Sequence, residues 1–259
     1  MTGDLLLEVE DGIAWATFNR PSARNALTFA MYEGLAEICG RVDLDPSIKI
    51  LILTGAGDEA FAAGTDIEEF RSFGSADDVL AYEARIEAAL GVLERCRAPT
   101  IAAIAGACMG GGLMIAACCD IRIGARGAKL GMPIARTLGN CLSLRNYARL
   151  AALIGPARVK DLVLTARLVE AEEALGVGLL TEIVEAASEL RPRALELGRL
   201  ISGHAPLTLR ATKEALLRLR DEGLQTTADD LLLMCYLSED FREGVAAFLE
   251  KRRPKWRGI

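Results

Sequence analysis

Residues 99–120 read PTIAAIAGACMGGGLMIAACCD, and this stretch decides the fold. A short apolar run at 101–105 is followed by three consecutive glycines, Gly110–Gly112, and by a second apolar run that ends at Cys119. The pattern predicts a strand, a tight turn and a helix. Consecutive glycines let the backbone approach a ligand closely, and the first N–H groups of a helix are unpaired and lie at its positive end. Such a turn suits an oxygen atom that becomes negative during a reaction.

Two other interpretations of this stretch need no such chemistry. Residues 101–119 carry no charge and are long enough to cross a membrane, but a spanning helix would be rich in Leu and Phe, whereas this run is mostly Ala and Gly. We therefore expect no membrane association. A glycine turn that only packs a helix against a sheet stays open as an alternative. A nucleotide-binding loop is disfavoured, because the Gly-Lys-Ser/Thr ending and the dinucleotide spacing are both absent.

Length and composition limit the function further. The 259 residues fit one large domain, or one domain with an extension, and the net charge of −6 argues against nucleic-acid binding. The acidic start of the chain has no basic-then-apolar leader, so we expect no secretory signal and a cytoplasmic location. Cys118 and Cys119 are adjacent in an apolar run, which is typical of small buried residues in a reducing compartment. No Cys/His cluster has the spacing of metal ligands, so we expect no metal site.

The first third of the chain alternates strand and helix patterns. Leu5–Val9 and Ile13–Phe18 flank a break that carries a glycine, which predicts a β-hairpin. Thr28 is a plausible N-cap for a helix that ends at an Asp-Pro pair. Ile48–Leu53 is a buried-strand pattern, and a polar stretch with apolar residues on one side predicts a helix over 67–97.

The remaining segments predict an α/β core followed by helices. We expect strands at 121–123, 129–132 and near Ile183, a polar loop at 133–143, helices at 144–154, 156–164 and 171–175, and a helical region at 186–251. The alternation of strands and helices followed by an all-helical end predicts an α/β core over 1–190 and a helical C-terminal subdomain over 191–259.

Three segments, taken together, resemble one protein family. NRPSARNAL (19–27), TGAGDEAFAAGTDI (54–67) and GACMGGGLMIAACCD (106–120) are similar to successive signatures of the enoyl-CoA hydratase/isomerase, or crotonase, superfamily. The likeness continues through 155–180 and 248–256. It implies a crotonase-like spiral of repeated β-β-α units, a helical C-terminal trimerisation region in a homotrimer or homohexamer, and an acyl-CoA substrate. It implies no permanently bound cofactor, since coenzyme A enters as part of the substrate.

The resemblance also assigns binding residues. Two backbone N–H groups are expected to bind the thioester oxygen, and the matching positions are Thr65 and Gly111. Such a pair stabilises the enolate oxyanion by about 3 kcal/mol per donor. The positions implied for coenzyme A are Ala63, Gly64, Asp66 and Ile67, with Arg24 near the phosphates or pantetheine and with Lys251 and Trp256 reaching a CoA or acyl pocket of this chain or a neighbour. For Arg24 and Lys251, an ordinary solvated charge is the alternative.

The sequence departs from the family pattern at the two positions that transfer protons in the family. The resemblance implies two glutamates as general acid and base. The matching positions hold Met114 and Ile134, whose side chains cannot donate or accept a proton. Hydration by the ordinary mechanism is therefore not expected. The replacement candidates with a catalytic role are Arg136, Asn140 and Glu69, and Thr137 and Ser143 join Met114 and Ile134 as substrate-pocket candidates. Each polar candidate alone could be surface polarity or a helix cap. The single histidine, His204, is interpreted as structural.

Three hypotheses remain open at this point. One is a lyase or isomerase, or a thioester hydrolase, with a non-standard proton carrier. A second is decarboxylation of a malonyl-type CoA, which needs enolate stabilisation but no starting base, with Arg136 or Arg145 orienting the carboxylate. Against it, tight binding of that carboxylate would also stabilise the ground state. The third is a non-catalytic acyl-CoA-binding protein.

Overall fold

The computed structural model describes residues 3–71, 74–223 and 227–259. The chain divides into two compact units, Met1–Glu196 and Leu197–Ile259, which we call the core unit and the C-terminal unit. The division falls inside helix α7 (Ala187–Ser202), a short way beyond the predicted boundary after residue 190. Each unit is described by itself below.

The larger sheet of the core unit has six strands within the described residues, in the order β1-β2-β3-β5-β7-β10. All neighbours are parallel except β1 and β2, which form the predicted hairpin. Consecutive buried residues in β3 and β5 are typical of parallel strands covered on both faces. The strands are β1 (Leu5–Glu10), β2 (Ile13–Phe18), β3 (Ile50–Gly55), β5 (Thr100–Ile104), β7 (Ile121–Ala125) and β10 (Glu182–Val184).

A second, smaller sheet runs in the order β4-β6-β8-β9 within the same described residues. Its strands are β4 (Ala60–Ala62), β6 (Ala107–Met109), β8 (Lys129–Gly131) and β9 (Leu168–Glu170). β3 leads into β4, β5 into β6 and β7 into β8, and a helix follows each pair. This succession is the β-β-α repeat that the family resemblance implied. Because β4, β6 and β8 are parallel, the segments that follow them emerge at one edge of the small sheet.

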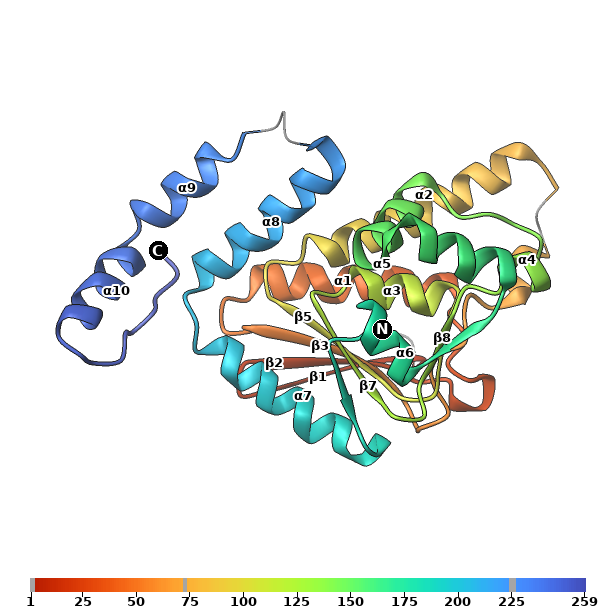
Figure 1. Ribbon diagram of the computed structural model, residues 1–259, viewed down its shortest axis with the longest axis horizontal. Coiled ribbons are helices and arrows are strands. Elements are labelled where there is room, and N and C mark those ends of the chain that lie inside the picture. The colour runs from red at the N-terminus through yellow and green to blue at the C-terminus, as the bar shows by residue number, and fades with distance from the viewer. Residues whose placement is uncertain (1–2, 72–73, 224–226) are drawn as a thin grey trace. The chain divides into compact units, whose positions relative to one another are not determined.

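The helices of the core unit cover the sheets (Figure 1). They are α1 (Phe29–Leu44), α2 (Ala76–Glu94), α3 (Gly111–Cys118), α4 (Ile134–Thr137), α5 (Leu144–Thr165) and α6 (Ala171–Val177), with short 3₁₀ turns η1 (Pro21–Ala23) and η2 (Ile67–Phe70). Thr28 caps α1 as predicted, with its side chain accepting a hydrogen bond from the Met31 N–H. The adjacent Cys118 and Cys119 form no disulfide with any described residue and are buried, also as predicted.

Two predicted elements are wrong in detail, and the predicted break between the helices at 144–154 and 156–164 is confirmed. The single helix over 67–97 is instead η2 and α2, because Ser75 has extended backbone and forms a capping box with Asp78 that starts a new helix. Residues 72–73 of that stretch lie outside the described residues. The loop over 133–143 contains the helical turn α4. Gly155, at φ 76° and ψ 153°, breaks α5 where the sequence predicted two helices.

Helices are the only regular secondary structure in the described residues of the C-terminal unit, as the sequence predicts for 186–251; residues 224–226 lie outside them. It contains the end of α7 and helices α8 (Pro206–Glu222), α9 (Asp229–Tyr236) and α10 (Glu239–Leu249). The last residues fold back onto α10, since the Asp240 carboxylate accepts hydrogen bonds from the N–H groups of Arg257 and Gly258. Among the helices of the described residues, none is both long and apolar enough to cross a membrane.

Candidate functional site

Two glycine-containing segments lie side by side at the edge of the small sheet. One follows β4 and contains Gly64 and Thr65, and the other follows β6 and contains Gly110 and Gly111. A Cβ atom built on Gly110 would lie 3.6 Å from the Cα of Gly64, and one built on Gly111 would lie 3.0 Å from the Thr65 hydroxyl oxygen. The structure therefore brings together the two residues that the sequence predicted as donors to the thioester oxygen.

The backbone N–H groups of these two residues are unpaired. Leu27 forms a parallel bridge with Thr65, using the Gly64 carbonyl and the Asp66 N–H, which leaves the Thr65 N–H outside that bridge. Gly111 begins α3, so its N–H precedes the helical ladder. No residue in the described part of the chain accepts a hydrogen bond from either group. Two free donors, one of them at a helix N-terminus, can bind an oxygen that gains negative charge.

Close packing explains why the turn consists of glycines. Gly110 has φ 51° and ψ −119°, a conformation that residues with a Cβ atom rarely adopt. A Cβ atom on Gly112 would lie 2.4 Å from the Ala62 carbonyl oxygen, so only glycine lets α3 pack this closely on β4. On Gly111, it would lie 2.1 Å from the hydroxyl of Tyr32.

Two tyrosines that the sequence analysis missed support the loop after β4. The Tyr32 hydroxyl lies 2.9 Å from the Thr65 hydroxyl oxygen, and burial raises the pKa of Tyr32 well above its usual value. The Tyr82 ring packs against Phe70 of η2 and against Phe29, and burial likewise raises the pKa of Tyr82. Tyr32 lies on the apolar stripe of α1, where a sequence pattern shows only a core residue. Its hydroxyl partner becomes visible only in three dimensions.

Charged groups fix the same loop from its other side. The Arg20 guanidinium donates a hydrogen bond of 2.8 Å to Asp66, which lowers the pKa of Asp66. The Asp66 side chain also caps η2 by accepting from the Glu68 N–H. Glu69 accepts a hydrogen bond from the Phe29 N–H at the start of α1, so its carboxylate is engaged in joining η2 to α1. Glu69, a catalytic candidate from the sequence, therefore also has a structural role.

The residues predicted to bind coenzyme A lie along this loop and beside it. The Arg24 carbonyl accepts a hydrogen bond from the Ala63 N–H, while its guanidinium is exposed and lies 4.0 Å from Glu59. Ile67 is 64% exposed, which is unusual for an isoleucine beside a buried loop and suits contact with a ligand. Lys251 is exposed in the C-terminal unit. These assignments stay predictions.

The two positions that lack glutamates are buried and apolar. Met114 lies in the first turn of α3, with its N–H donating to the Gly110 carbonyl, and its side chain is 3% exposed. Ile134 begins α4 and is 7% exposed. Neither side chain can hold a water molecule by hydrogen bonding or exchange a proton with it.

The polar candidates after Ile134 are placed differently from one another. Arg136 and Asn140 are exposed. The Thr137 hydroxyl donates to the Pro133 carbonyl within its own turn, and the Ser143 hydroxyl accepts from the Asn146 N–H as the N-cap of α5. Thr137 and Ser143 thus have local hydrogen bonds in addition to any contact with a substrate.

A buried ion cluster holds α2 against α5. The Arg149 side chain is fully buried and donates to Glu87 over two bonds of 2.6 Å and to Glu94 over 2.8 Å. These carboxylates raise the pKa of Arg149, although burial works in the opposite direction. Arg145, a sequence candidate for holding a substrate carboxylate, lies 3.6 Å from Glu87. Carboxylates on the apolar stripe of α2 were the available sequence signal for this cluster.

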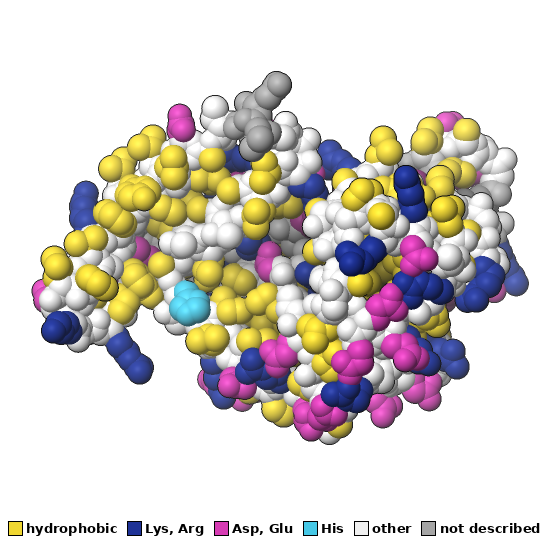
Figure 2. Space-filling model, in the orientation of Figure 1, with side chains coloured by type: hydrophobic (Ala, Val, Ile, Leu, Met, Phe, Trp, Pro, Cys, Tyr) yellow, Lys and Arg dark blue, Asp and Glu magenta, His cyan; other side chains and the backbone are white. Residues whose placement is uncertain are grey.

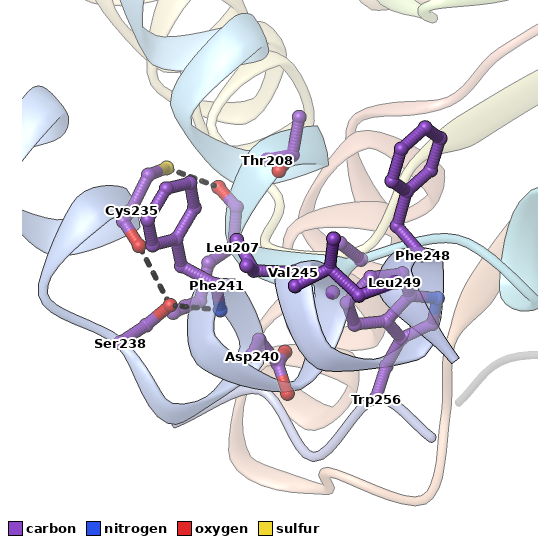
Figure 3. Close-up of a pocket in the computed structure, with 12 residues that line it drawn as sticks. Leu207, Thr208, Cys235, Ser238, Asp240, Phe241, Val245, Phe248, Leu249 and Trp256 are labelled. Atoms are coloured by element: carbon purple, nitrogen blue, oxygen red, sulfur yellow. Dashed lines mark hydrogen bonds between the residues drawn. The ribbon is translucent and has the colours of Figure 1, made fainter. Parts of the chain in front are cut away.

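A separate pocket of about 350 Å³ lies within the C-terminal unit (Figure 3). Its walls are mostly apolar side chains of α8 and α10, together with Trp256. Trp256 packs against Gly244, where a Cβ atom would lie 3.2 Å from the indole ring. The Ser238 hydroxyl joins the Cys235 carbonyl to the Phe241 N–H beside it. No cluster in the described residues has three side chains able to hold a metal ion.

Comparison with known proteins identifies the family. The enoyl-CoA hydratase/isomerase family model matches residues 8–258. The chain belongs to the enoyl-CoA hydratase/isomerase family. It is 36% identical to a crotonyl-CoA hydratase of Syntrophomonas wolfei and 35% identical to a short-chain-enoyl-CoA hydratase of Clostridium acetobutylicum, with 96% of both chains covered in each case. The fold matches an enoyl-CoA hydratase/carnithine racemase from Magnetospirillum magneticum with a TM-score of 0.92, at 36% identity over 100% of this chain and 97% of the other. Membership in this family confirms the resemblance and the crotonase-like fold predicted from the sequence.

Proposed function

We propose that this member of the family binds an acyl-CoA thioester and stabilises its enolate through the N–H groups of Thr65 and Gly111. The observation that carries the proposal is the adjacency of these two unpaired donors. When charge moves onto the thioester oxygen, each donor strengthens its hydrogen bond and lowers the barrier by about 3 kcal/mol. The donors are held in place before the substrate arrives, because Tyr32 and the glycine packing of α3 fix both segments.

The proposed site for coenzyme A follows the loop after β4. Ala63, Gly64, Asp66 and Ile67 would line the adenine pocket, with Arg24 toward the phosphates or pantetheine. Coenzyme A is part of the substrate in this proposal. Lys251 and Trp256 would reach a CoA or acyl pocket of this chain or of a neighbouring copy. The exposed Ile67 supports the first part of the proposal, since an apolar side chain beside a polar loop offers a face for a flat ring.

The reaction is proposed to be that of a lyase or isomerase which does not use the usual pair of glutamates. Met114 and Ile134 leave an apolar wall where that pair would act, whereas the relatives cited above carry the name hydratase. Decarboxylation and thioester hydrolysis are the catalytic alternatives. Arg145 is drawn toward Glu87, which leaves Arg136 as the freer of the two arginines considered for a substrate carboxylate.

Product analysis by mass spectrometry tests the proposal. Crotonyl-CoA, but-3-enoyl-CoA and methylmalonyl-CoA would each be incubated with the protein and with the variants Arg136→Ala and Glu69→Ala, and binding would be measured by calorimetry. We expect CoA esters to bind and the double bond of but-3-enoyl-CoA to migrate. Hydration of crotonyl-CoA at an enzymatic rate would contradict the inference drawn from Met114 and Ile134. Binding without turnover of any substrate would establish the non-catalytic alternative, and no binding would refute the proposal.

We further propose that the C-terminal unit mediates a homotrimer or a dimer of trimers. Figure 2 shows hydrophobic side chains gathered over α9 and α10. The apolar residues of these helices that are more than half exposed include Leu232, Leu233, Phe248 and Leu249. Exposed apolar surface of this kind is typical of an interface. Analytical ultracentrifugation tests it, since a monomer would refute the proposal. A reducing, cytoplasmic location is also proposed, and the free cysteines support it.

A further inference from the structure

Three glutamates share one face of α2. Glu83, Glu87 and Glu94 are spaced so that they lie along the same side of the helix as the buried Ile86 and Leu90. This side faces α3, which begins at Gly111, and α5, which carries Arg149. Carboxylates on an inward face need partners, because burial disfavours the charged form.

Among the described residues, two of the three glutamates have such partners. Arg149 binds both Glu87 and Glu94, and Arg145 adds a second positive charge near Glu87. Glu83 is half-buried and has no hydrogen bond or ion pair with any residue in the ranges that the structure describes. A half-buried carboxyl without a partner, at one end of a fully paired cluster, is a candidate for chemistry.

The helix that carries Glu83 also contacts the elements around the candidate oxyanion donors. α2 packs against α1, which carries Tyr32, and against α3, which begins at Gly111. The Tyr32 hydroxyl lies 2.9 Å from the Thr65 hydroxyl oxygen, and a Cβ atom on Gly111 would lie 2.1 Å from the same hydroxyl. The Glu83 charge also contributes to the raised pKa of Tyr32. The side of α2 that carries Glu83 therefore faces the helix whose first residue, Gly111, is a candidate oxyanion donor.

The surroundings of the Glu83 carboxyl favour its protonated form more than water does. Burial and the negative charge of Glu87 raise the pKa of Glu83. The other titratable groups around this part of α2 are Tyr32 of α1, Tyr82 of α2 itself, Cys118 of α3, and Arg145 and Arg149 of α5. Burial raises the pKa values of the tyrosines and of Cys118, which keeps them neutral, and both arginines are engaged with Glu87.

We propose that Glu83 carries the proton in the reaction of the bound acyl-CoA, in the place of the two glutamates that Met114 and Ile134 replace. The inference rests on the proposed function of Thr65 and Gly111. The Glu83 carboxylate removes a proton from C2 of a 3-enoyl thioester, and the electron pair of the broken C–H bond forms the enolate, whose oxygen the two N–H groups bind. As the C=O bond re-forms, the C2=C3 double bond forms, the C3=C4 pair takes the proton back from Glu83 at C4, and the carboxylate is regenerated.

A single carboxyl suffices for this reaction, because the same proton leaves one carbon and reaches another. Hydration would need a second group to hold and activate a water molecule, and the apolar side chains of Met114 and Ile134 provide none. The proposal therefore favours migration of a double bond over addition of water.

Deuterium incorporation tests the role of Glu83. But-3-enoyl-CoA would be incubated in D₂O with the wild-type protein, with Glu83→Gln and with the control Glu37→Gln, an exposed residue of α1 that makes no contact with the site. Isomerisation would be followed by absorbance and deuterium at C2 and C4 by mass spectrometry, while calorimetry reports binding of butyryl-CoA. We expect Glu83→Gln to lose at least about 100-fold in rate with unchanged binding, and Glu37→Gln to match the wild type.

The outcomes separate this inference from the proposed function. A Glu83→Gln variant that isomerises as fast as the wild type overturns the role of Glu83 and leaves the oxyanion site standing. A wild type that binds butyryl-CoA but does not isomerise but-3-enoyl-CoA overturns it as well, whether or not deuterium is incorporated, because Glu83 can return the proton that it removed. Absence of CoA-ester binding by the wild type would instead refute the proposed function.

The pH profile distinguishes catalysis from a structural role. Because Glu87 raises the pKa of Glu83, Glu87→Gln is expected to move the acidic limb of the rate profile to lower pH. A structural role for Glu83 would leave that limb where it is. Partial recovery of the rate in Glu83→Asp, which keeps the carboxyl on a shorter side chain, would further support proton transfer.

Discussion

Replacement of Arg149 by methionine tests how the ion cluster holds α2 in place. The guanidinium donates three hydrogen bonds of 2.6–2.8 Å to Glu87 and Glu94, and its side chain is fully buried. Arg149→Met keeps most of the volume but leaves two carboxylates without their main counter-charge, one of them nearly inaccessible. Removing one partner of a buried pair in this way costs roughly 3–5 kcal/mol of folding free energy.

Urea unfolding followed by circular dichroism measures this loss at a fixed protein concentration. Arg145→Met is the matched control, because that guanidinium is exposed and lies 3.6 Å from the same Glu87, so its loss should cost less than about 1 kcal/mol. The deficit of Arg149→Met should narrow as the pH is lowered, since protonation relieves the unpaired carboxylates. Equal and small losses in both variants, or a deficit independent of pH, would refute this reasoning.

Three further predictions concern the oxyanion loops. Gly112→Ala should lose roughly 1–3 kcal/mol of stability, because the new methyl group would overlap the Ala62 carbonyl. Acyl-CoA turnover should fall as well. Chemical denaturation measures the first effect and rate assays measure the second. Tyr32→Phe should lose about 1 kcal/mol of stability, because it removes the hydrogen bond between Tyr32 and Thr65. It should lower kcat with little change in KM, since the hydroxyl positions the Thr65 loop without touching the substrate, and a raised KM with unchanged kcat in steady-state kinetics would contradict this. The hydrogen bond from Arg20 lowers the pKa of Asp66, so the ionised Asp66 carboxylate stabilises the fold at pH values above the usual carboxyl pKa. Asp66→Asn should therefore cost about 1–2 kcal/mol of stability at pH 7 and progressively less as the pH falls through the native pKa. Thermal unfolding measured across this pH range checks the prediction.

The sequence predicted those parts of the fold that depend on local patterns. The hairpin of β1 and β2, the cap of α1 and the turn at Gly110–Gly112 each follow from residue type and spacing. The adjacency of Thr65 and Gly111 came from the family resemblance. A separation of nearly fifty residues in the sequence does not show that two residues are close in space. The parallel pairing of β4 with β6 brings Thr65 and Gly111 together.

The missed features depend on partners that are distant in sequence. Ser75 interrupts the helix predicted over 67–97, because its capping box with Asp78 starts α2. The capping-box residues are visible in the sequence, but the helical spacing of the apolar residues was given more weight. Tyr32 appeared only as a core residue, because its bond to Thr65 joins two segments. Glu83 was not a candidate from the sequence, because only the structure shows that Arg149 pairs with Glu87 and Glu94 on the same face of α2.

The infrared frequency of a labelled thioester carbonyl tests the central claim most directly. Butyryl-CoA labelled with ¹³C at C1 is saturated, so it reports binding at the oxyanion donors without double-bond chemistry. Two hydrogen bonds from the Thr65 and Gly111 N–H groups should polarise the carbonyl and move its stretching band to lower frequency than in water. A bound ester whose carbonyl band stays at the frequency found in water would contradict the account.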